Sequence, residues 1–199
     1  MSDEIKFDFK KDPIENFQIL YKQAQTKGIP DANALSLATV SQNKPSVRVV
    51  LFKGMVRGGF SFFTNYDGRK ARDMAANSNV AAQFFWPHLD QQVRIEGVVE
   101  KLTREESEQY FFTRPRLSQL GAWTSNQSST LESFESFKNK LDEIELKFKG
   151  QPVPCPEHWG GYRIIPEEIE FWFGKPGRLH QRFIYQKNNQ DWNRFLRSP

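Results

Sequence analysis

The chain has 199 residues, of which 38% are hydrophobic and 26% are charged, with a formal net charge of +4. One cysteine excludes an internal disulfide, three isolated histidines fit no familiar zinc spacing, and no apolar run is long enough to span a membrane. The N-terminus has no apolar signal-peptide core, so we expect a cytoplasmic protein with no membrane segment and no metal site. Its basic residues form small separate groups, which favours small anions over nucleic acid as ligands.

The first predicted element is a helix that begins at Asp12-Pro13. Asp12 supplies an N-cap, Pro13 a preset first helical residue and Glu15 a capping-box partner, and Gly28 is a natural stop. We therefore expect residues 1–12 to form a flexible N-terminal arm. The length of the rest suits one domain, over residues 13–199.

Three strand-like segments follow, separated by the turn-prone stretches SQNKP and VRGG. They cover residues 34–40, 46–54 and 59–66 and predict an antiparallel meander. A short helix over residues 69–77 comes next. Two more strands are then expected, over 80–86 and 91–102.

Two helices are expected in the second half of the chain. The first begins at Thr103 with Glu106 as its capping-box partner and must end near Arg114, because Pro115 follows. Tyr110 and Arg114 then share one helical face. The second has about five turns, and its apolar stripe is expected to pack into the core: Leu131, Phe134, Phe137, Leu141, Ile144 and Phe148.

A Pro-rich linker leads to the closing strands, which are expected at 162–166, 169–174, 178–186 and 191–197. The chain thus has many short strands, few helices and no alternating strand-helix units. This pattern predicts an α+β fold, mainly antiparallel β, in which a barrel or sandwich is flanked by helices.

The segment GRLHQRF carries three cationic or titratable side chains at alternate positions. In a strand, Arg178, His180 and Arg182 would project from one face, beside Trp172 of the preceding strand. Such a row can bind a planar or anionic ligand. It can equally be a solvated edge strand whose charge blocks aggregation.

Two further basic groups suggest phosphate sites. Arg69, Lys70 and Arg72 lie in the first turn of a predicted helix, where the helix dipole disfavours cations unless an anion is bound. Exposed residues that tolerate the dipole are the alternative. At a later helix end, a hydroxyl and guanidinium cluster suits a second phosphate or is simply a capped helix terminus: Tyr110, Arg114 and Ser118. In the strand RVVLFK, the odd separation is expected to send Arg48 and Lys53 to opposite faces.

No Gly-rich dinucleotide fingerprint or P-loop is present, so a cofactor held by discrete side chains must supply any difficult chemistry. Eight motifs occur in one order: RVVLFK, FFTNYDGRKA, QQVRIEG, YFFTRPRLSQLGAW, NQSS, HWGGYRI, IEFW and GRLHQRF. In this order the chain resembles the pyridoxine/pyridoxamine 5′-phosphate oxidase family from about Leu35 to Tyr185. The resemblance implies an FMN-binding split β-barrel with flanking helices and a homodimer with FMN in clefts between the subunits. It also implies oxidation of pyridoxine or pyridoxamine 5′-phosphate to pyridoxal 5′-phosphate by O2, with release of H2O2.

The resemblance also implies roles for particular residues. Those expected to bind FMN are Arg48, Val49, Val50, Leu51, Phe52, Lys53, Phe63, Thr64, Arg69, Lys70, Gln92, Gln127, Ser128, Trp172 and Arg182. Those expected to bind the substrate are Lys53, Tyr110, Arg114 and Ser118 at its phosphate, and Arg178 and His180 at its ring, the last two being the catalytic residues.

The chain departs from the family pattern at four places. Phe63 replaces the usual Tyr, Phe173 stands where Gln is usual, Gln181 replaces an Asp, and the chain ends in LRSP rather than Arg-Leu-x-Pro. An alternative hypothesis is therefore a split-barrel relative that binds FMN or pyridoxal 5′-phosphate as a carrier or sensor with little turnover.

Overall fold

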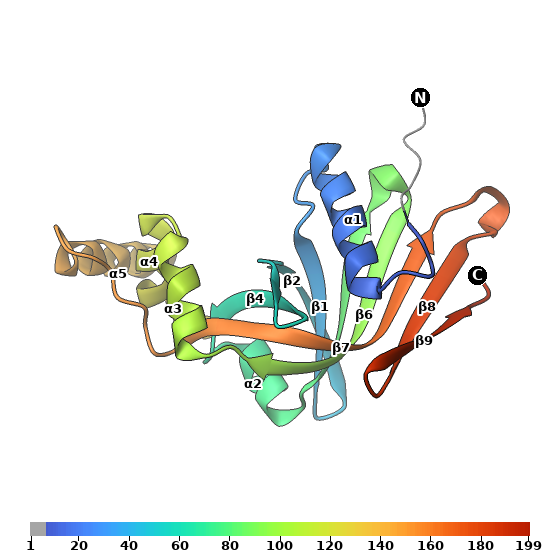
Figure 1. Cartoon of the computed structure of the whole chain (residues 1–199). Helices are drawn as coiled ribbons and strands as arrows, with labels where there is room; N and C mark the ends of the chain where they lie inside the picture. Colours follow the sequence, from blue (N-terminus) through green and yellow to red (C-terminus); the bar gives the residue numbers. More distant parts are fainter. Residues whose placement is uncertain (1–6) are drawn as a thin grey trace.

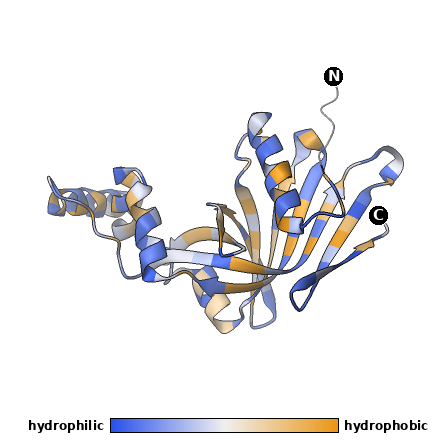
Figure 2. Ribbon diagram, in the orientation of Figure 1, coloured by the Kyte–Doolittle hydropathy of each residue, from blue (hydrophilic) through white to orange (hydrophobic). Residues whose placement is uncertain are grey.

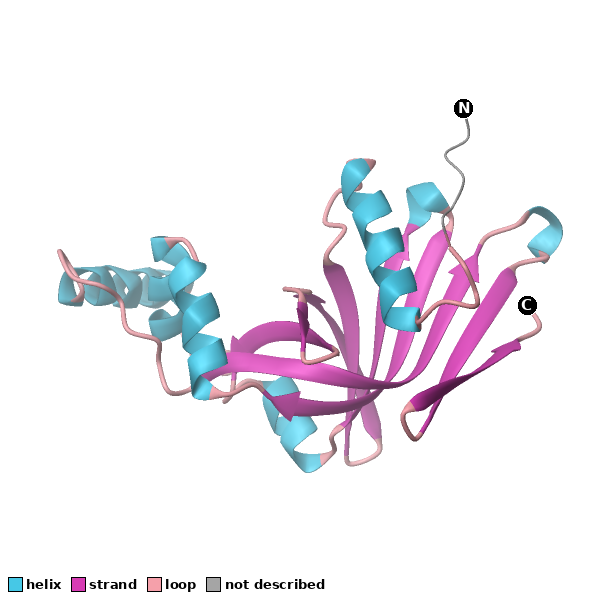
Figure 3. Cartoon of the chain, viewed as in Figure 1, coloured by secondary structure: helices cyan, strands magenta, loops and turns pink. Residues whose placement is uncertain are grey.

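The computed structural model describes residues 7–199, and in this range the fold is an antiparallel sheet with helices packed over it and beyond one of its ends (Figures 1 and 3). The helices are α1 (Pro13–Thr26), α2 (Arg69–Ala76), α3 (Arg104–Thr113), α4 (Arg116–Thr124) and α5 (Phe134–Lys147). The strands are β1 (Ala34–Ser41), β2 (Lys44–Leu51), β3 (Met55–Val56), β4 (Gly59–Asn65), β5 (Asn79–Trp86), β6 (Gln91–Lys101), β7 (Trp159–Phe173), β8 (Gln181–Asn188) and β9 (Asp191–Leu196). Within these residues each helix is too short or too polar to cross a lipid bilayer.

The strands follow the order β2-β1-β5-β6-β7-β4-β3, and β8 and β9 continue the sheet from β7. The expected meander is confirmed only in part. β1 and β2 pair along their length, but β4 meets the expected second strand only at its end and pairs along its own length with β7. The chain after β2 returns to β4 through two hydrogen bonds, from Lys53 N to Ser61 O (2.9 Å) and from Ser61 N to Gly54 O (3.0 Å). These bonds bring the two ends of the strand order together as a barrel.

The 15-residue strand β7 joins the two parts of the sheet. It covers residues that the sequence divides into two strands at Pro166. Residues 159–164 pair with β4, whereas residues 168–173 pair with β8. A register shift against β6 at Glu96/Gly97 lies between these pairings. On one side of β7 the neighbouring strand therefore changes from β4 to β8 near this bulge. On its other side β7 pairs with β6 both before and after the bulge.

Aromatic side chains fill the barrel, as the 18 Phe residues of the chain suggest. Phe17 of α1 is fully buried and packs edge-on against Phe60 of β4, with ring centroids 4.8 Å apart. Figure 2 shows the apolar residues that α1 and the strands contribute. In residues 7–12, the described part of the expected flexible arm, two aromatic side chains pack on this sheet. The Phe7 ring lies 5.2 Å from Phe171 and the Phe9 ring 5.3 Å from Tyr185. The rest of the expected arm, residues 1–6, lies outside the described residues.

A second, smaller apolar cluster lies under α3, α4 and α5 and includes Phe111, Leu120 and Phe148. Helix α4 was not predicted. The expected five-turn helix is shorter, because α5 begins at Phe134. Its stripe is core only in part, since Leu141 and Ile144 are partly buried against the cluster whereas Phe134 is 86% exposed.

Candidate functional site

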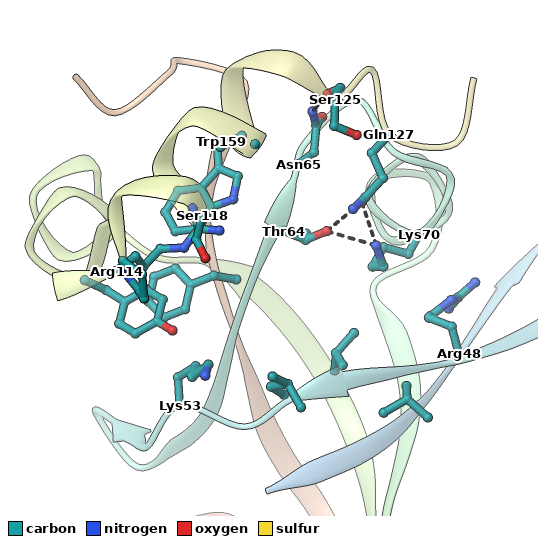
Figure 4. Close-up of a pocket in the computed structure, with 18 of the residues that line it drawn as sticks. Arg48, Lys53, Thr64, Asn65, Lys70, Arg114, Ser118, Ser125, Gln127 and Trp159 are labelled. Atoms are coloured by element: carbon teal, nitrogen blue, oxygen red, sulfur yellow. Dashed lines mark hydrogen bonds between the residues drawn. The ribbon is translucent and has the colours of Figure 1, made fainter. Parts of the chain in front are cut away.

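A cavity of about 770 Å³ lies between the barrel and the α3–α4 pair. It is bounded by β2, β4, the first turn of α2 and the ends of α3 and α4 (Figure 4). Twelve of the residues expected to bind FMN or substrate line it: Arg48, Val49, Val50, Leu51, Lys53, Phe63, Thr64, Lys70, Tyr110, Arg114, Ser118 and Gln127. The two basic groups that the sequence suggested as phosphate sites thus contribute to one cavity.

On one side of this cavity, three side chains form a hydrogen-bonded triangle. Lys70 Nζ donates to Thr64 Oγ1 (2.9 Å) and to Gln127 Oε1 (2.7 Å), and Thr64 Oγ1 donates to the same Gln127 oxygen (2.9 Å) (Figure 4). Burial lowers the pKa of Lys70, and the neighbouring positive charge of Arg48 lowers it further. An anion at this position would offset both effects.

Arg48 lies beside this triangle, and hydrogen bonds to β1 and to its own strand, β2, hold its guanidinium. Its Nη1 donates to Thr39 Oγ1 (2.7 Å) and its Nη2 donates to Ser46 Oγ (2.9 Å). Burial also lowers the pKa of Arg48, against the effect of the nearby Asp73. The prediction that Arg48 and Lys53 serve opposite faces is wrong. β2 ends at Leu51, so the alternation no longer applies at Lys53, and both side chains line the cavity.

On the other side of the cavity, α3 positions an aromatic and guanidinium stack. The Phe63 ring stacks on Tyr110 (centroids 4.0 Å apart) and on Trp159 (5.5 Å), which also lie 6.3 Å from each other, all in nearly parallel planes. The guanidinium of Arg114 lies 4.6 Å from the Trp159 ring, which suits a cation–π contact. Its Nη1 is buried and has no hydrogen-bond partner within residues 7–199, and burial lowers its pKa. A buried unpaired guanidinium nitrogen is a favourable place for an anion.

The end of α3 places these groups as the sequence predicts. Thr103 and Glu106 form the expected capping box, the helix ends at Thr113, and Arg114 is its extended C-cap before Pro115. Ser118 then lies in the first turn of α4, on the wall of the same cavity.

Gln92, Trp172 and Arg182 form a second group, apart from this cavity. They are directly opposite one another on β6, β7 and β8, so they make one row on one face of the sheet. Arg182 donates to both carboxylate oxygens of the buried Glu170, from Nε (3.0 Å) and Nη2 (2.8 Å). The Trp172 ring lies 4.7 Å from the ring of His180.

The prediction that Arg178 and His180 lie on a strand is wrong. Residues Pro176–Arg178 form a single 3-10 turn, in which Gly177 and Arg178 have positive φ, and β8 begins only at Gln181. The Pro-Gly pair turns the chain and breaks the expected alternation. His180 remains beside the row by accepting a hydrogen bond at Nδ1 from the backbone N–H of Lys175 (3.2 Å).

Three other expected cofactor contacts do not line the cavity. Phe52 is buried in the barrel core, the Arg69 side chain is 60% exposed beside Asp73, and Ser128 lines a smaller neighbouring hollow. Sequence reasoning missed Asn65 and Trp159, which do line the cavity. Both occur in motifs that were recognised, FFTNYDGRKA and HWGGYRI, so the signal was present.

The separation between the two groups follows from β7. Trp159, at its first residue, lines the cavity, whereas Trp172 is 13 residues further along the same strand. At about 3.3 Å per residue, that is about 40 Å along the strand. Figure 1 shows β8 and β9 at the opposite end of the molecule from α3 and α4.

Comparison with known proteins decides the family. The family model described as Pyridoxamine 5′-phosphate oxidase matches residues 21–148, and the model described as Pyridoxine 5′-phosphate oxidase C-terminal dimerisation region matches residues 159–199. The chain belongs to the pyridoxamine 5′-phosphate oxidase family. Among curated members of the family, the pyridoxine/pyridoxamine 5′-phosphate oxidase of Bdellovibrio bacteriovorus is 51% identical over 195 residues, covering 97% of this chain and 100% of that one. The enzyme of the same name from Leptospira biflexa is 49% identical over 94% of this chain and 89% of that one.

Solved structures agree with this family. PhzG from Burkholderia lata 383, in complex with tetrahydrophenazine-1-carboxylic acid, has a TM-score of 0.89 at 28% identity and covers 94% of this chain and 93% of its own. An FMN-binding protein related to pyridoxamine 5′-phosphate oxidase, from Nostoc punctiforme, has a TM-score of 0.76 at 15% identity, with 96% and 100% covered. At that identity it supports the fold alone, and the predicted α+β split-barrel class is confirmed.

Proposed function

We propose that this chain is an FMN-dependent oxidase that converts pyridoxine 5′-phosphate and pyridoxamine 5′-phosphate to pyridoxal 5′-phosphate, with O2 as the acceptor and H2O2 as the second product. Family membership supports the reaction class. The observation that carries the proposal is one cavity with two separate cationic groups, one around Lys70 and one around Arg114. A phosphorylated cofactor and a phosphorylated substrate require two such groups.

The Lys70 side of the cavity suits the phosphate of FMN. The hydrogen-bonded triangle presents the ammonium of Lys70, the hydroxyl of Thr64 and the amide of Gln127. The guanidinium of Arg48 lines the cavity beside them. Charge-assisted hydrogen bonds from such groups are the strong ones in phosphate recognition. The adjoining residues 49–51 give the flavin ring a largely apolar wall.

The Arg114 side suits the phosphate of the substrate. The unpaired Arg114 Nη1 needs an acceptor, and the phenol of Tyr110, the hydroxyl of Ser118 and the ammonium of Lys53 line the same wall. Lys53 Nζ lies 5.8 Å from the centre of the Tyr110 ring. A substrate held here by its phosphate would extend its pyridine ring toward the flavin wall.

We infer that the remaining groups reach the cavity from a second copy of the chain. A face of the sheet exposes Val47, Val49, Leu51 and Phe85, with exposed fractions of 44–69%. Strand register puts these residues on the same face as the row Gln92, Trp172 and Arg182. An apolar face of this kind is typical of a subunit interface. The family's dimerisation region, matched by residues 159–199, contains Trp172, Arg182, Arg178 and His180.

The chain's own residues bind and orient in this mechanism. Bound FMN would supply the redox chemistry that links oxidation of the substrate carbon bearing the alcohol or amine to reduction of O2. Lys53, Tyr110, Arg114 and Ser118 hold the substrate phosphate, and the partner's Arg178 and His180 hold the pyridine ring against the flavin. Positioning of this kind can account for a large part of the rate enhancement.

One pair of measurements tests the proposal. The purified protein is expected to be yellow, with a flavin absorbance spectrum and one FMN per chain, and to release H2O2 when pyridoxine 5′-phosphate is added. A colourless protein that binds no FMN in a fluorescence titration would contradict the proposal. Flavin binding without peroxide release would favour the carrier or sensor hypothesis instead.

A further inference from the structure

A buried carboxylate lies behind the cations on the Lys70 side of the cavity. Asp73 is one turn after Arg69 on α2, and only 7% of its surface is exposed. Its Oδ2 accepts a hydrogen bond from Thr39 Oγ1 (2.8 Å) and lies 3.6 Å from Arg48 Nη2 and 3.9 Å from Arg69 Nε. A single carboxylate oxygen therefore contacts one hydroxyl and two guanidinium groups.

Thr39 links Asp73 to Arg48. The fully buried Thr39 hydroxyl has one proton, which it donates to Asp73, so its lone pairs are free to accept from Arg48 Nη1 at 2.7 Å. Ser46 Oγ accepts from the other terminal nitrogen, Nη2 (2.9 Å). These contacts fix the plane of the Arg48 guanidinium at the edge of the cavity.

The charges explain why a carboxylate is needed at this place. Arg48, Arg69 and Lys70 have the same sign, and the positive charge of Arg69 adds to the burial that lowers the pKa of Arg48. The Asp73 carboxylate opposes both effects. Without the Asp73 carboxylate, burial and repulsion from Arg69 would favour an Arg48 conformer turned toward water and away from the cavity.

We propose that Asp73 is a positioning residue for the cofactor phosphate, acting through Thr39 to hold the Arg48 guanidinium at the cavity wall. This inference rests on the proposed FMN site. Asp73 itself repels an anion, so any benefit to phosphate binding must come from orientation and not from its charge. If Asp73 acted on FMN only through its negative charge, removing that charge would tighten FMN binding. If Asp73 orients Arg48, removing the charge would weaken FMN binding.

The test compares FMN with riboflavin, which has the same ring but no phosphate. In Asp73→Asn the Kd for FMN is expected to rise about tenfold, the effect of one charge-assisted hydrogen bond, while the Kd for riboflavin stays unchanged. Thr39→Val is expected to give the same result, and Thr39→Ser, which restores the hydroxyl, to recover parental affinity. Tighter or unchanged FMN binding in Asp73→Asn would overturn the inference. So would an equal loss for both flavins, because that result indicates a structural role.

Asp67→Asn is the matched control. Asp67 precedes the same helix and is exposed, and within the described residues its hydrogen bonds use its backbone N–H and carbonyl. Removing its charge is expected to leave the Kd for FMN unchanged or slightly lower. A weakening as large as that in Asp73→Asn would show that charge anywhere near α2 has the effect, and would overturn the inference.

A second measurement separates this inference from the proposed function. If the parent bound no FMN, the proposed function would fail. Side-chain NMR of the flavin-free protein would still show whether the Arg48 guanidinium is held. Rotation about its Cζ–Nε bond is expected to be slow in the parent and fast in Asp73→Asn. Equal rotation rates in the two proteins would refute the positioning role.

Discussion

Arg114 combines three properties that rarely occur together in one side chain. It caps α3, its guanidinium lies on the Trp159 ring, and its Nη1 is buried without a partner within the described residues. Arg114→Lys keeps the charge but removes the planar fork and the stacking surface. We expect KM for pyridoxine 5′-phosphate to rise about ten- to a hundredfold, the effect of one lost charge-assisted hydrogen bond, with little change in kcat.

Steady-state peroxide assays check this prediction. Arg116→Lys is a matched control, because the guanidinium of Arg116 donates to the backbone carbonyls of Phe148 and Gln151. KM is expected to be unchanged in the control. A KM equal to that of the parent in Arg114→Lys would contradict the assignment of Arg114 to the substrate site.

Lys70 makes cofactor binding dependent on pH. In the free protein burial and Arg48 hold the pKa of Lys70 below 10.5, and a bound phosphate dianion raises it. FMN binding therefore takes up a proton, and affinity is expected to fall as pH rises from the lowered pKa of the free protein to the higher pKa of the complex. Fluorescence titrations over an alkaline pH series check this, and Lys70→Gln should flatten the slope. An identical slope in Lys70→Gln would assign the effect to another group.

The same shift has the opposite effect on the stability of the flavin-free protein. The unfolded chain holds the Lys70 proton more tightly than the folded one, so the free energy of unfolding rises as pH passes from the lowered pKa toward 10.5.

At the scale of elements, α3 depends on its capping box to place Tyr110 and Arg114. Thr103→Ala removes the hydrogen bond from the Glu106 N–H to Thr103 Oγ1, and we expect a loss of about 1 kcal/mol in the free energy of unfolding. Urea denaturation measures it. Thr26→Ala, at an exposed residue in the last turn of α1, is the control and should change stability by less than about 0.5 kcal/mol. Equal losses in both variants would show that the cap contributes nothing specific.

The bulge between β6 and β7 requires Gly97. A Cβ at this position would lie 2.1 Å from Ile165 O and 3.0 Å from Glu167 N, which are backbone atoms that cannot turn aside. We expect Gly97→Ala to lower the free energy of unfolding by about 1–3 kcal/mol or more. Gly121→Ala, in α4 with open space around it, should instead raise stability by about 0.5–1 kcal/mol. Thermal or urea unfolding of both variants tests the contrast, and a neutral Gly97→Ala would contradict the close packing of the bulge.

Local signals in the sequence predicted most elements but not their pairing. The Asp12 and Thr103 caps and the strand alternation in residues 80–101 correspond to α1, α3, β5 and β6. The pairing of β4 with β7, and the continuity of β7 through Pro166, depend on contacts between distant residues. Such contacts leave no periodicity in the sequence. Near Arg178 the sequence contains a turn signal, the pair Pro176-Gly177, which argues against the strand expected from the alternation of Arg178, His180 and Arg182.

At the scale of the molecule, the cavity side chains were predictable as a group because ordered motifs carried them. The division of the expected site residues into two distant groups was not predictable, because it depends on the course of β7, which separates Trp159 from Trp172. The resemblance implied a homodimer, and the matched dimerisation region supports it. The distance between the two groups is the argument for a site shared between subunits.

A shared site predicts complementation between two variants that are each impaired when assayed at a substrate concentration well below the parental KM. Arg114→Ala damages the cavity, and Arg178→Met damages the group proposed to come from the partner. In a mixed dimer one of the two sites carries both changes and the other carries neither. Random reassociation of equal amounts is expected to restore about a quarter of parental activity, because half of the dimers are mixed and each has one intact site.

Peroxide assays before and after unfolding and refolding of the mixture measure this recovery. Each variant refolded alone is the control and should stay impaired at the same low substrate concentration. If the mixture is no more active than the separate variants, each chain builds its site alone and the partner contributes nothing to it.

The bulge at Gly97 lies opposite the middle of the 15-residue strand β7, so a bend at the bulge would displace the ends of the strand. Either end lies about 20 Å from the bulge at about 3.3 Å per residue, so a bend of about 3° moves an end by about 1 Å. A displacement of that size can cost about a hundredfold in rate. In the proposed dimer one end of the strand belongs to its own chain's cavity and the other to its partner's. Because β7 is paired with β6 along most of its length, the stiffness of this part of the sheet would contribute to the alignment of both proposed reaction centres.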